Sequence, residues 1–214
     1  MPSARFPDWH ARRLYAIVDL GYLTAAQAPA AAAALLAGGA DVLQLRAKGH
    51  SPDDLGDLAR ELARISRGAG VPFILNDFPE LAAAVAADGV HLGQDDGSLA
   101  AARAICGPDF IFGRSTHSLP QARAALAEGF DYLGFGPLFP TPTKLGRPAI
   151  GLDALAEVNS LAGSTIPVFA IGGIVPANLA TVLAAGATRV VVVSALLNAP
   201  DITAATRSLR DSLG

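Results

Sequence analysis

The feature of this sequence that most constrains its fold is a regular alternation of short β-branched or aromatic runs with longer stretches rich in alanine and leucine. The short runs predict strands at residues 14–19, 42–46, 72–76, 89–92, 110–115, 132–135, 167–171 and 189–193. The longer stretches predict helices at residues 25–37, 52–67, 79–86, 98–105, 120–127, 152–161, 178–184 and 202–213. Because strand and helix alternate throughout 214 residues, we expect an α/β protein, a single-domain (β/α)8 TIM barrel.

A weak internal repeat favours a closed ring. A glycine stands just before the second, sixth and eighth predicted strands and at the start of the fourth: Gly39, Gly129, Gly186 and Gly89. We expect each to end a helix in the left-handed conformation, which glycine adopts without strain. A repeat of two βα units fits the alternating layers of a barrel. An open, doubly wound sheet is the alternative, but its Gly-x-Gly-x-x-Gly fingerprint is missing after the first strand.

Composition limits the protein's surroundings and partners. Apolar residues make up 51% of the chain, but glycine, proline or charge interrupts them before a membrane-spanning length is reached. A net charge of -3 gives no general attraction to nucleic acid or to an anionic membrane. Cys106 is the sole cysteine, and residues 1–12 form a proline-containing leader without a secretory pattern. We therefore expect one soluble, cytoplasmic domain over residues 1–214, with its leader surface-bound or frayed and with homo-oligomers possible.

Polar residues and glycines collect where the predicted strands end. In a barrel, the loops at the C-terminal ends of the strands converge on one face. The loop after the sixth strand carries Thr141, Thr143 and Lys144, while Gly172-Gly173 and Ser194 follow the seventh and eighth strands. Barrels often bind a phosphate at these last two positions through backbone N–H groups. The sequence predicts a phosphate site here, and a tight turn without a ligand is the alternative.

A second, more highly charged anion site is predicted on other loops of the same face. Arg46, Lys48 and Lys144 are three cations that follow different strands. Asp77 and Asp96 are suitable ligands for Mg²⁺, which one or two carboxylates commonly hold together with water and phosphate oxygens. The alternatives are a solvated basic rim and two helix N-caps. Together the five residues favour a metal-bridged diphosphate.

Three further polar residues each allow two interpretations. Ser115 is either a donor to substrate or a cap for the following helix, and His91 either contacts substrate or faces the barrel. His117 is a general base or, as we prefer, a supporting residue held by hydrogen bonds. The cysteine and histidine residues lack zinc spacing, and no Ser-His-Asp order stands out.

The combination of these motifs resembles the thiamine-phosphate synthase family over residues 14–197. The resemblance is carried by Gln44-Leu-Arg-Ala-Lys48, Asn76-Asp77, Val90-His-Leu-Gly-Gln-Asp-Asp96, Ser115-Thr-His117, the loop from Gly136 to Lys144, Ile171-Gly-Gly-Ile174 and Val193-Ser194. It implies a barrel enzyme that joins a hydroxymethylpyrimidine diphosphate to a thiazole phosphate, with Mg²⁺ as cofactor and small molecules as its only substrates.

The resemblance also implies residue roles. It assigns the pyrimidine diphosphate to Gln44, Arg46, Lys48, Asn76, Ser115 and Lys144, the metal to Asp77 and Asp96, and the thiazole phosphate to Thr141, Thr143, Gly173, Val193 and Ser194. Catalysis is expected from Arg46, Lys48, Ser115 and Lys144. Two positions depart from the family pattern: Ala47 replaces a longer or acidic side chain, and Phe78 replaces a common arginine. Both departures concern affinity more than the reaction.

Two other functions stay open. A thiazole tautomerase of the same superfamily would use a histidine such as His117 for proton transfer. It would have no diphosphate to neutralise, so Asp77, Asp96 and Lys144 argue against it. The other candidate is a non-catalytic barrel that only binds a phosphate ligand.

Overall fold

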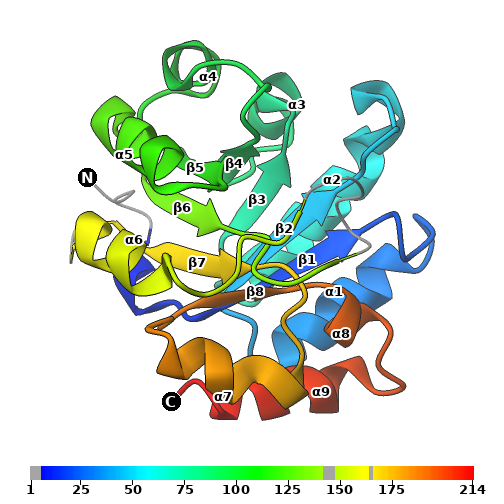
Figure 1. Cartoon of the computed structure of the whole chain (residues 1–214). Coiled ribbons are helices and arrows are strands. Elements are labelled where there is room, and N and C mark those ends of the chain that lie inside the picture. The colour runs from blue at the N-terminus through cyan, green and yellow to red at the C-terminus, as the bar shows by residue number, and fades with distance from the viewer. Residues whose placement is uncertain (1–5, 142–147, 164–165) are drawn as a thin grey trace.

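The computed structural model describes residues 6–141, 148–163 and 166–214, and it contains eight parallel strands that close into one barrel in sequence order (Figure 1). The strands are β1 (Leu14–Asp19), β2 (Val42–Arg46), β3 (Phe73–Asn76), β4 (Gly89–Leu92), β5 (Ile111–Thr116), β6 (Tyr132–Phe135), β7 (Val168–Ile171) and β8 (Val190–Val192). The barrel closes through parallel pairing of β1 with β8. The predicted fold is confirmed.

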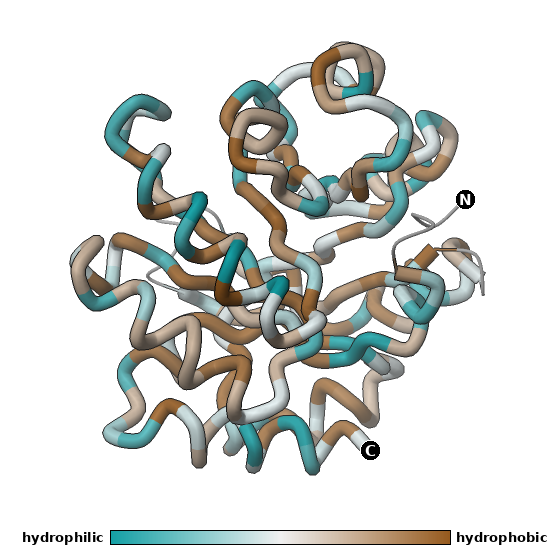
Figure 2. The backbone as a smooth tube through the Cα atoms, turned by 180° about the vertical axis from the view of Figure 1, so that it is seen from behind, coloured by the Kyte–Doolittle hydropathy of each residue, from teal (hydrophilic) through white to brown (hydrophobic). Residues whose placement is uncertain are grey.

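Helices surround the strands on the outside of the barrel (Figure 1). They are α1 (Ala28–Ala37), α2 (Pro52–Gly68), α3 (Pro79–Ala84), α4 (Leu99–Cys106), α5 (Leu119–Glu128), α6 (Leu155–Ala162), α7 (Pro176–Ala184), α8 (Ser194–Leu197) and α9 (Ile202–Asp211). The strands are largely buried, and Figure 2 shows apolar segments through the middle of the molecule with hydrophilic segments along the outer helices. In the described part of the chain, no helix combines the length and apolar character needed to cross a bilayer.

Paired strands are joined at their amino ends by a repeated aspartate. Asp41 Oδ2 accepts the backbone N–H of Leu14 at 2.8 Å, Asp88 Oδ2 that of Phe73 at 2.9 Å, and Asp131 Oδ2 that of Phe112 at 2.8 Å. In each case the aspartate's own N–H donates back to the carbonyl of the same partner, at 2.8 Å. These contacts give a physical cause for the repeat of two βα units, because each aspartate satisfies a backbone donor at the start of the preceding strand.

The glycine prediction is right at three of its four positions. Gly39, Gly129 and Gly186 have φ of 95°, 89° and 102°, in the left-handed region where an added side chain would be strained. Gly89 is an exception, because it lies within β4 and is needed for space. A Cβ there would lie 2.3 Å from the carbonyl oxygen of Ile111. The prediction of a left-handed helix end at Gly89 is therefore wrong.

The end of the leader is part of the core. Residues Trp9–Ala11 form a short 3-10 helix, η1, and Trp9 is only 1% exposed. Its ring meets the Tyr132 ring edge-on with centroids 5.2 Å apart, and the Phe169 ring lies 6.2 Å away. The expectation of a surface-bound or frayed leader is wrong at Trp9, because this large ring covers aromatic side chains of the barrel interior.

Gly113 makes room for Tyr132 inside the barrel. A Cβ at Gly113 would lie 2.0 Å from Tyr132 Cζ, far inside any allowed contact. Gly68, at the exposed end of α2, has nothing within 4 Å of the same atom.

We expect Gly113→Ala to lower the free energy of unfolding by about 3 kcal/mol, at the upper end of the cost of overpacking a core. Gly68→Ala is the matched control and should leave the free energy unchanged or raise it by roughly 0.5 kcal/mol, since alanine is the better helix former. Urea denaturation followed by circular dichroism measures both. An equal effect of the two substitutions would contradict this account of Gly113.

Candidate active site

Three adjoining pockets lie at the C-terminal ends of the strands. We call them the glycine pocket, which includes Gly172 and Gly173, the central pocket inside the barrel, and the aspartate pocket, which includes Asp77 and Asp96. Ser115, at the end of β5, lines all three, and it is only 6% exposed. The structure therefore brings both predicted anion sites to one mouth, with Ser115 at their junction.

The glycine pocket is shaped by the turn after β7. Gly172 and Gly173 have φ of 102° and 64°, and a Cβ on Gly173 would lie 2.7 Å from Phe139 Cβ. The loop after β6 packs directly on this turn, with Phe139 N–H donating to Gly172 O at 3.0 Å. Asn178 of α7 holds the other side through a 2.9 Å hydrogen bond from its Nδ2 to Gly173 O. Only glycine allows this conformation and this close approach together.

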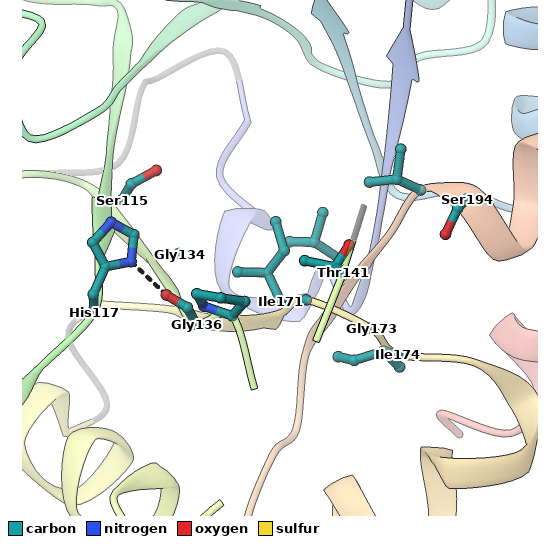
Figure 3. A pocket seen from close by; sticks show the side chains of 13 residues that line it. Ser115, His117, Gly134, Gly136, Thr141, Ile171, Gly173, Ile174 and Ser194 are labelled. Carbon is teal, nitrogen blue, oxygen red and sulfur yellow. Dashed lines mark hydrogen bonds between the residues drawn. The ribbon is translucent and has the colours of Figure 1, made fainter. Parts of the chain in front are cut away.

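Residues from three loops face the glycine pocket. Figure 3 shows Thr141 from the β6 loop, Gly173 from the β7 loop and Ser194 from the start of α8 around one space, and Val193 also lines it. His117 lines the opposite side, where its Nδ1–H donates to Gly136 O. The hydroxyl groups of Thr141 and Ser194, with the backbone of the glycine turn that lines the pocket, suit the oxygens of a phosphate group.

The aspartate pocket contains two carboxyl groups in contact with each other and a cation. Lys48 Nζ lies 2.7 Å from Asp77 Oδ2, and Asp96 Oδ2 accepts the backbone N–H of Gly93 at 2.7 Å. Burial and a hydrogen bond with Asp96 raise the pKa of Asp77. Burial opposes ionisation of Asp96 as well, but hydrogen bonds from Asp77 and Gly93 lower its pKa overall. The two carboxyl groups therefore titrate as a unit, and Asp77 takes up a proton more readily than Asp96.

The capping alternatives for three predicted site residues do not hold. Ser98 caps α4 and Ser118 caps α5, each accepting a backbone N–H with its side chain, so neither Asp96 nor Ser115 has this role. The residue before α3 is Phe78, and no side-chain cap bond forms there. Asp77 instead has φ of 71°, a conformation unusual for a residue other than glycine. Its carboxylate is thereby available to the pocket.

Arg46 is held by a carboxylate that the sequence analysis missed. Arg46 Nη1 donates to Asp19 Oδ2 at 2.6 Å, and the Asp19 side chain is 1% exposed. The other oxygen, Oδ1, accepts the Gly21 backbone N–H at 2.9 Å. Asp19 is the last residue of β1, directly opposite Arg46 in the pairing of β1 with β2. Its place at a strand end was the available signal, but no neighbouring motif drew attention to it.

The central pocket is lined by five predicted site residues, Gln44, Arg46, Asn76, Ser115 and Val193, and by three polar residues without an assigned role. Gln44 and Asn76 line it, as the resemblance implied for substrate-binding residues. Tyr15, Tyr132 and His91 also line it, and they connect to Gln44 and Ser115 through hydrogen bonds. The two tyrosines lie within apolar strand patterns, so no motif indicated a polar interior.

Two predicted residues, Thr143 and Lys144, lie outside the described residues. The other predicted site residues are placed at the mouth. Arg46 and Lys48 line the aspartate pocket with Asp77 and Asp96, while Thr141, Gly173, Val193 and Ser194 line the glycine pocket.

The fold and this mouth define a (β/α)8-barrel enzyme whose polar groups gather at the carboxyl ends of its strands. The chain belongs to the thiamine monophosphate synthase family, whose model matches residues 14–196. It is 45% identical over 211 residues to thiamine-phosphate synthase of Chloroflexus aurantiacus, covering 98% of this chain and 95% of that protein. With the enzyme of the same name from Thermus thermophilus it shares 49% identity over 178 residues, covering 83% of this chain and 85% of that protein.

A solved structure gives the same result. Thiamine phosphate pyrophosphorylase from Pyrococcus furiosus superimposes with a TM-score of 0.85 at 34% sequence identity, covering 95% of this chain and 96% of that one. The family prediction is confirmed, and the protein is an enzyme of the transferase class.

The buried contact between Asp19 and Arg46 generates a prediction about stability. We expect Asp19→Ala to lower the free energy of unfolding by about 3 kcal/mol, because it leaves a largely buried guanidinium without its carboxylate. Asp57→Ala removes the carboxylate of the exposed pair with Arg60 and should change the free energy by less than about 0.5 kcal/mol. In an Arg46→Met background the cost of Asp19→Ala should shrink, as measured by a double-mutant cycle in urea. A cost unchanged in that background would show that the contact with Arg46 is not its cause.

Proposed function

We propose that this protein joins 4-amino-2-methyl-5-(diphosphooxymethyl)pyrimidine to a thiazole phosphate, forming thiamine phosphate and releasing diphosphate. One observation carries the proposal. Two pockets suited to anions adjoin at one mouth and share Ser115. A reaction between one substrate with a diphosphate and one with a phosphate needs two such sites side by side.

The aspartate pocket would hold the diphosphate together with Mg²⁺. Its donor set fits this ion, because Asp77 and Asp96 offer hard carboxylate oxygens close enough to share a hydrogen bond. Within the described ranges no group of three or more acidic, histidine or cysteine residues could hold a metal. Two carboxylates leave coordination positions for substrate oxygens, which is how Mg²⁺ commonly binds phosphorylated substrates. Bound there, the ion would neutralise charge on the diphosphate.

The chain's own cations would stabilise the leaving group. As the bond between the pyrimidine methylene carbon and the diphosphate oxygen breaks, its electron pair leaves with the diphosphate, and the thiazole nitrogen forms the new bond to that carbon. Negative charge therefore grows on the diphosphate. Arg46 is already oriented by Asp19, and the half-exposed Lys48 can move from Asp77 to a phosphate oxygen. Such contacts lower the barrier because they are strongest where the charge peaks.

The glycine pocket would hold the thiazole phosphate. Thr141, Gly173, Val193 and Ser194 line it, and Thr143 is proposed to join them from outside the described residues. Lys144 is proposed as a third cation on the diphosphate, because it follows a strand whose end lies on the same face as those of Arg46 and Lys48. A cytoplasmic location and possible homo-oligomers complete the proposal, and both rest on the sequence alone.

The direct test supplies both substrates and measures released diphosphate with and without EDTA. We expect release only when both substrates and Mg²⁺ are present. A tautomerase would instead keep its activity under chelation and lose it in a His117→Asn variant. A non-catalytic barrel would bind the thiazole phosphate and release no diphosphate.

The aspartate pocket generates a prediction about rate. We expect Asp96→Asn to lower kcat on the order of 10²-fold at saturating Mg²⁺, comparable to the loss of one preorganised electrostatic contact in a transition state. Asp109→Asn, at an exposed position on the approach to β5, is the matched control and should leave kcat unchanged. Steady-state diphosphate release measures both. Near-normal turnover of Asp96→Asn would remove this residue from the proposed site.

A further inference from the structure

A continuous chain of hydrogen bonds runs through the barrel interior and ends at Ser115. Gln44 Nε2 donates to Tyr15 Oη at 2.8 Å, and Tyr15 Oη lies 3.0 Å from Tyr132 Oη. Tyr132 Oη is 3.0 Å from His91 Nδ1, and His91 Nε2 is 2.9 Å from Ser115 Oγ. Gln44 and both tyrosines are at most 2% exposed, so bulk water does not compete for these contacts. The chain links strands β1, β2, β4, β5 and β6 in one network.

The chain has a direction, because each phenol carries one hydrogen. Tyr15 accepts from the Gln44 amide, so its own hydrogen is available for Tyr132. In the arrangement that gives each phenol hydrogen an acceptor within the chain, Tyr132 accepts that hydrogen and directs its own toward His91 Nδ1. Burial raises the pKa of both phenols far above the ordinary value for tyrosine, so neither gives up its hydrogen at physiological pH. Each link therefore sets the direction of the next.

The direction determines what His91 and Ser115 do. A histidine that accepts at Nδ1 carries its hydrogen on Nε2, where it donates to Ser115 Oγ. Ser115 Oγ then acts as acceptor toward His91, and its own hydrogen is directed elsewhere. The three pockets at the mouth meet at this residue.

We propose that Tyr132 is a positioning residue which, through His91, keeps Ser115 as a hydrogen-bond donor toward the anionic ligand at the mouth. The identity of that ligand, a diphosphate, rests on the proposed function. Without Tyr132 Oη, His91 would lose this donor at Nδ1 and would also populate the tautomer with hydrogen on that nitrogen. Ser115 would then donate inward to His91 Nε2, and the ligand would lose a donor.

The packing around Tyr132 supports a specific role for its hydroxyl group. The ring is fully enclosed by Trp9, Tyr15 and Phe169, with centroid distances of 5.2, 5.9 and 5.8 Å, and Gly113 leaves the space it occupies. A phenylalanine would satisfy all of these contacts. The hydroxyl group adds a buried polar atom whose cost is offset only by the chain it completes.

The first test measures the His91 tautomer. Nitrogen-15 NMR of the imidazole groups distinguishes a hydrogen on Nε2 from one on Nδ1, and the His91 signals are those lost in a His91→Asn variant. We expect the Nε2–H tautomer in the unmodified protein and a mixture of tautomers in Tyr132→Phe. Finding Nδ1–H in the unmodified protein, or an unchanged tautomer in the variant, would overturn the proposal. This readout needs no substrate, so it stands even where the proposed reaction fails to occur.

The second test measures kinetics. We expect Tyr132→Phe to lower kcat about tenfold, the equivalent of one modest hydrogen bond to the transition state, with the KM for thiazole phosphate unchanged. In a Ser115→Ala background the same substitution should cost nothing further. Tyr15→Phe acts one link earlier and should cost less than Tyr132→Phe, whereas a purely structural role predicts equal effects. Additive losses in Tyr132→Phe/Ser115→Ala, or equal losses in the two phenylalanine variants, would contradict the proposed chain.

Thr206→Val provides the control for losing a buried hydroxyl group. Thr206 Oγ1 donates to Ile202 O at 2.7 Å within α9, on the outside of the barrel. The Thr206→Val substitution should reduce thermal stability to an extent similar to Tyr132→Phe while leaving kcat unchanged. A kcat loss in Thr206→Val equal to that in Tyr132→Phe would show that lost stability, and not the chain, lowers turnover.

Discussion

The closed ladder of parallel backbone hydrogen bonds is the constraint on which the site depends. Because all eight strands run the same way, their last residues meet at one mouth, and the register decides which of them face each other. Asp19 pairs with Arg46 and Asn76 with His91 in neighbouring strands. Aspartates 41, 88 and 131 reinforce this register at the opposite end, since each closes two hydrogen bonds between consecutive strands. The polar groups of the mouth are thus placed by backbone pairing before any ligand arrives.

The sequence predicts the barrel well because its local signals agree with the final structure. Strand centres are set by β-branched and aromatic runs, so the observed strands differ from the predicted ones by at most a residue at either end. Helix starts are less certain: α1 begins at Ala28 and not at 25, because Gln27 Oε1 accepts the Thr24 backbone N–H and forms a turn there. The short elements η1 and α8 have too few residues for any period to show.

The site was predictable in membership but not in its internal contacts. Charged or glycine-rich positions that directly follow a strand, such as Lys48, Asp77 and Gly173, can be recognised as site candidates from their position in the sequence. Interactions between strands far apart in sequence cannot be recognised in this way. Asp19 is separated from Arg46 by 27 positions and His91 from Tyr132 by 41, so no local pattern links them. Gly89 shows the same limit, because its need for space arises from Ile111 on the neighbouring strand and not from a helix end.

The mouth contains two ion pairs, Arg46 with Asp19 and Lys48 with Asp77, and they differ in how firmly the cation is held. Asp19 is buried and bonded on both oxygens, so Arg46 is fixed in place before any anion binds. Lys48 is 59% exposed and its partner Asp77 also contacts Asp96, so that ion pair exchanges partners at small cost. A fixed cation sets where an anion lies, while a mobile one follows charge as it moves. The proposed reaction must first bind and then release a highly charged group, so it needs both kinds of cation, and the different burial of the two carboxylates supplies them.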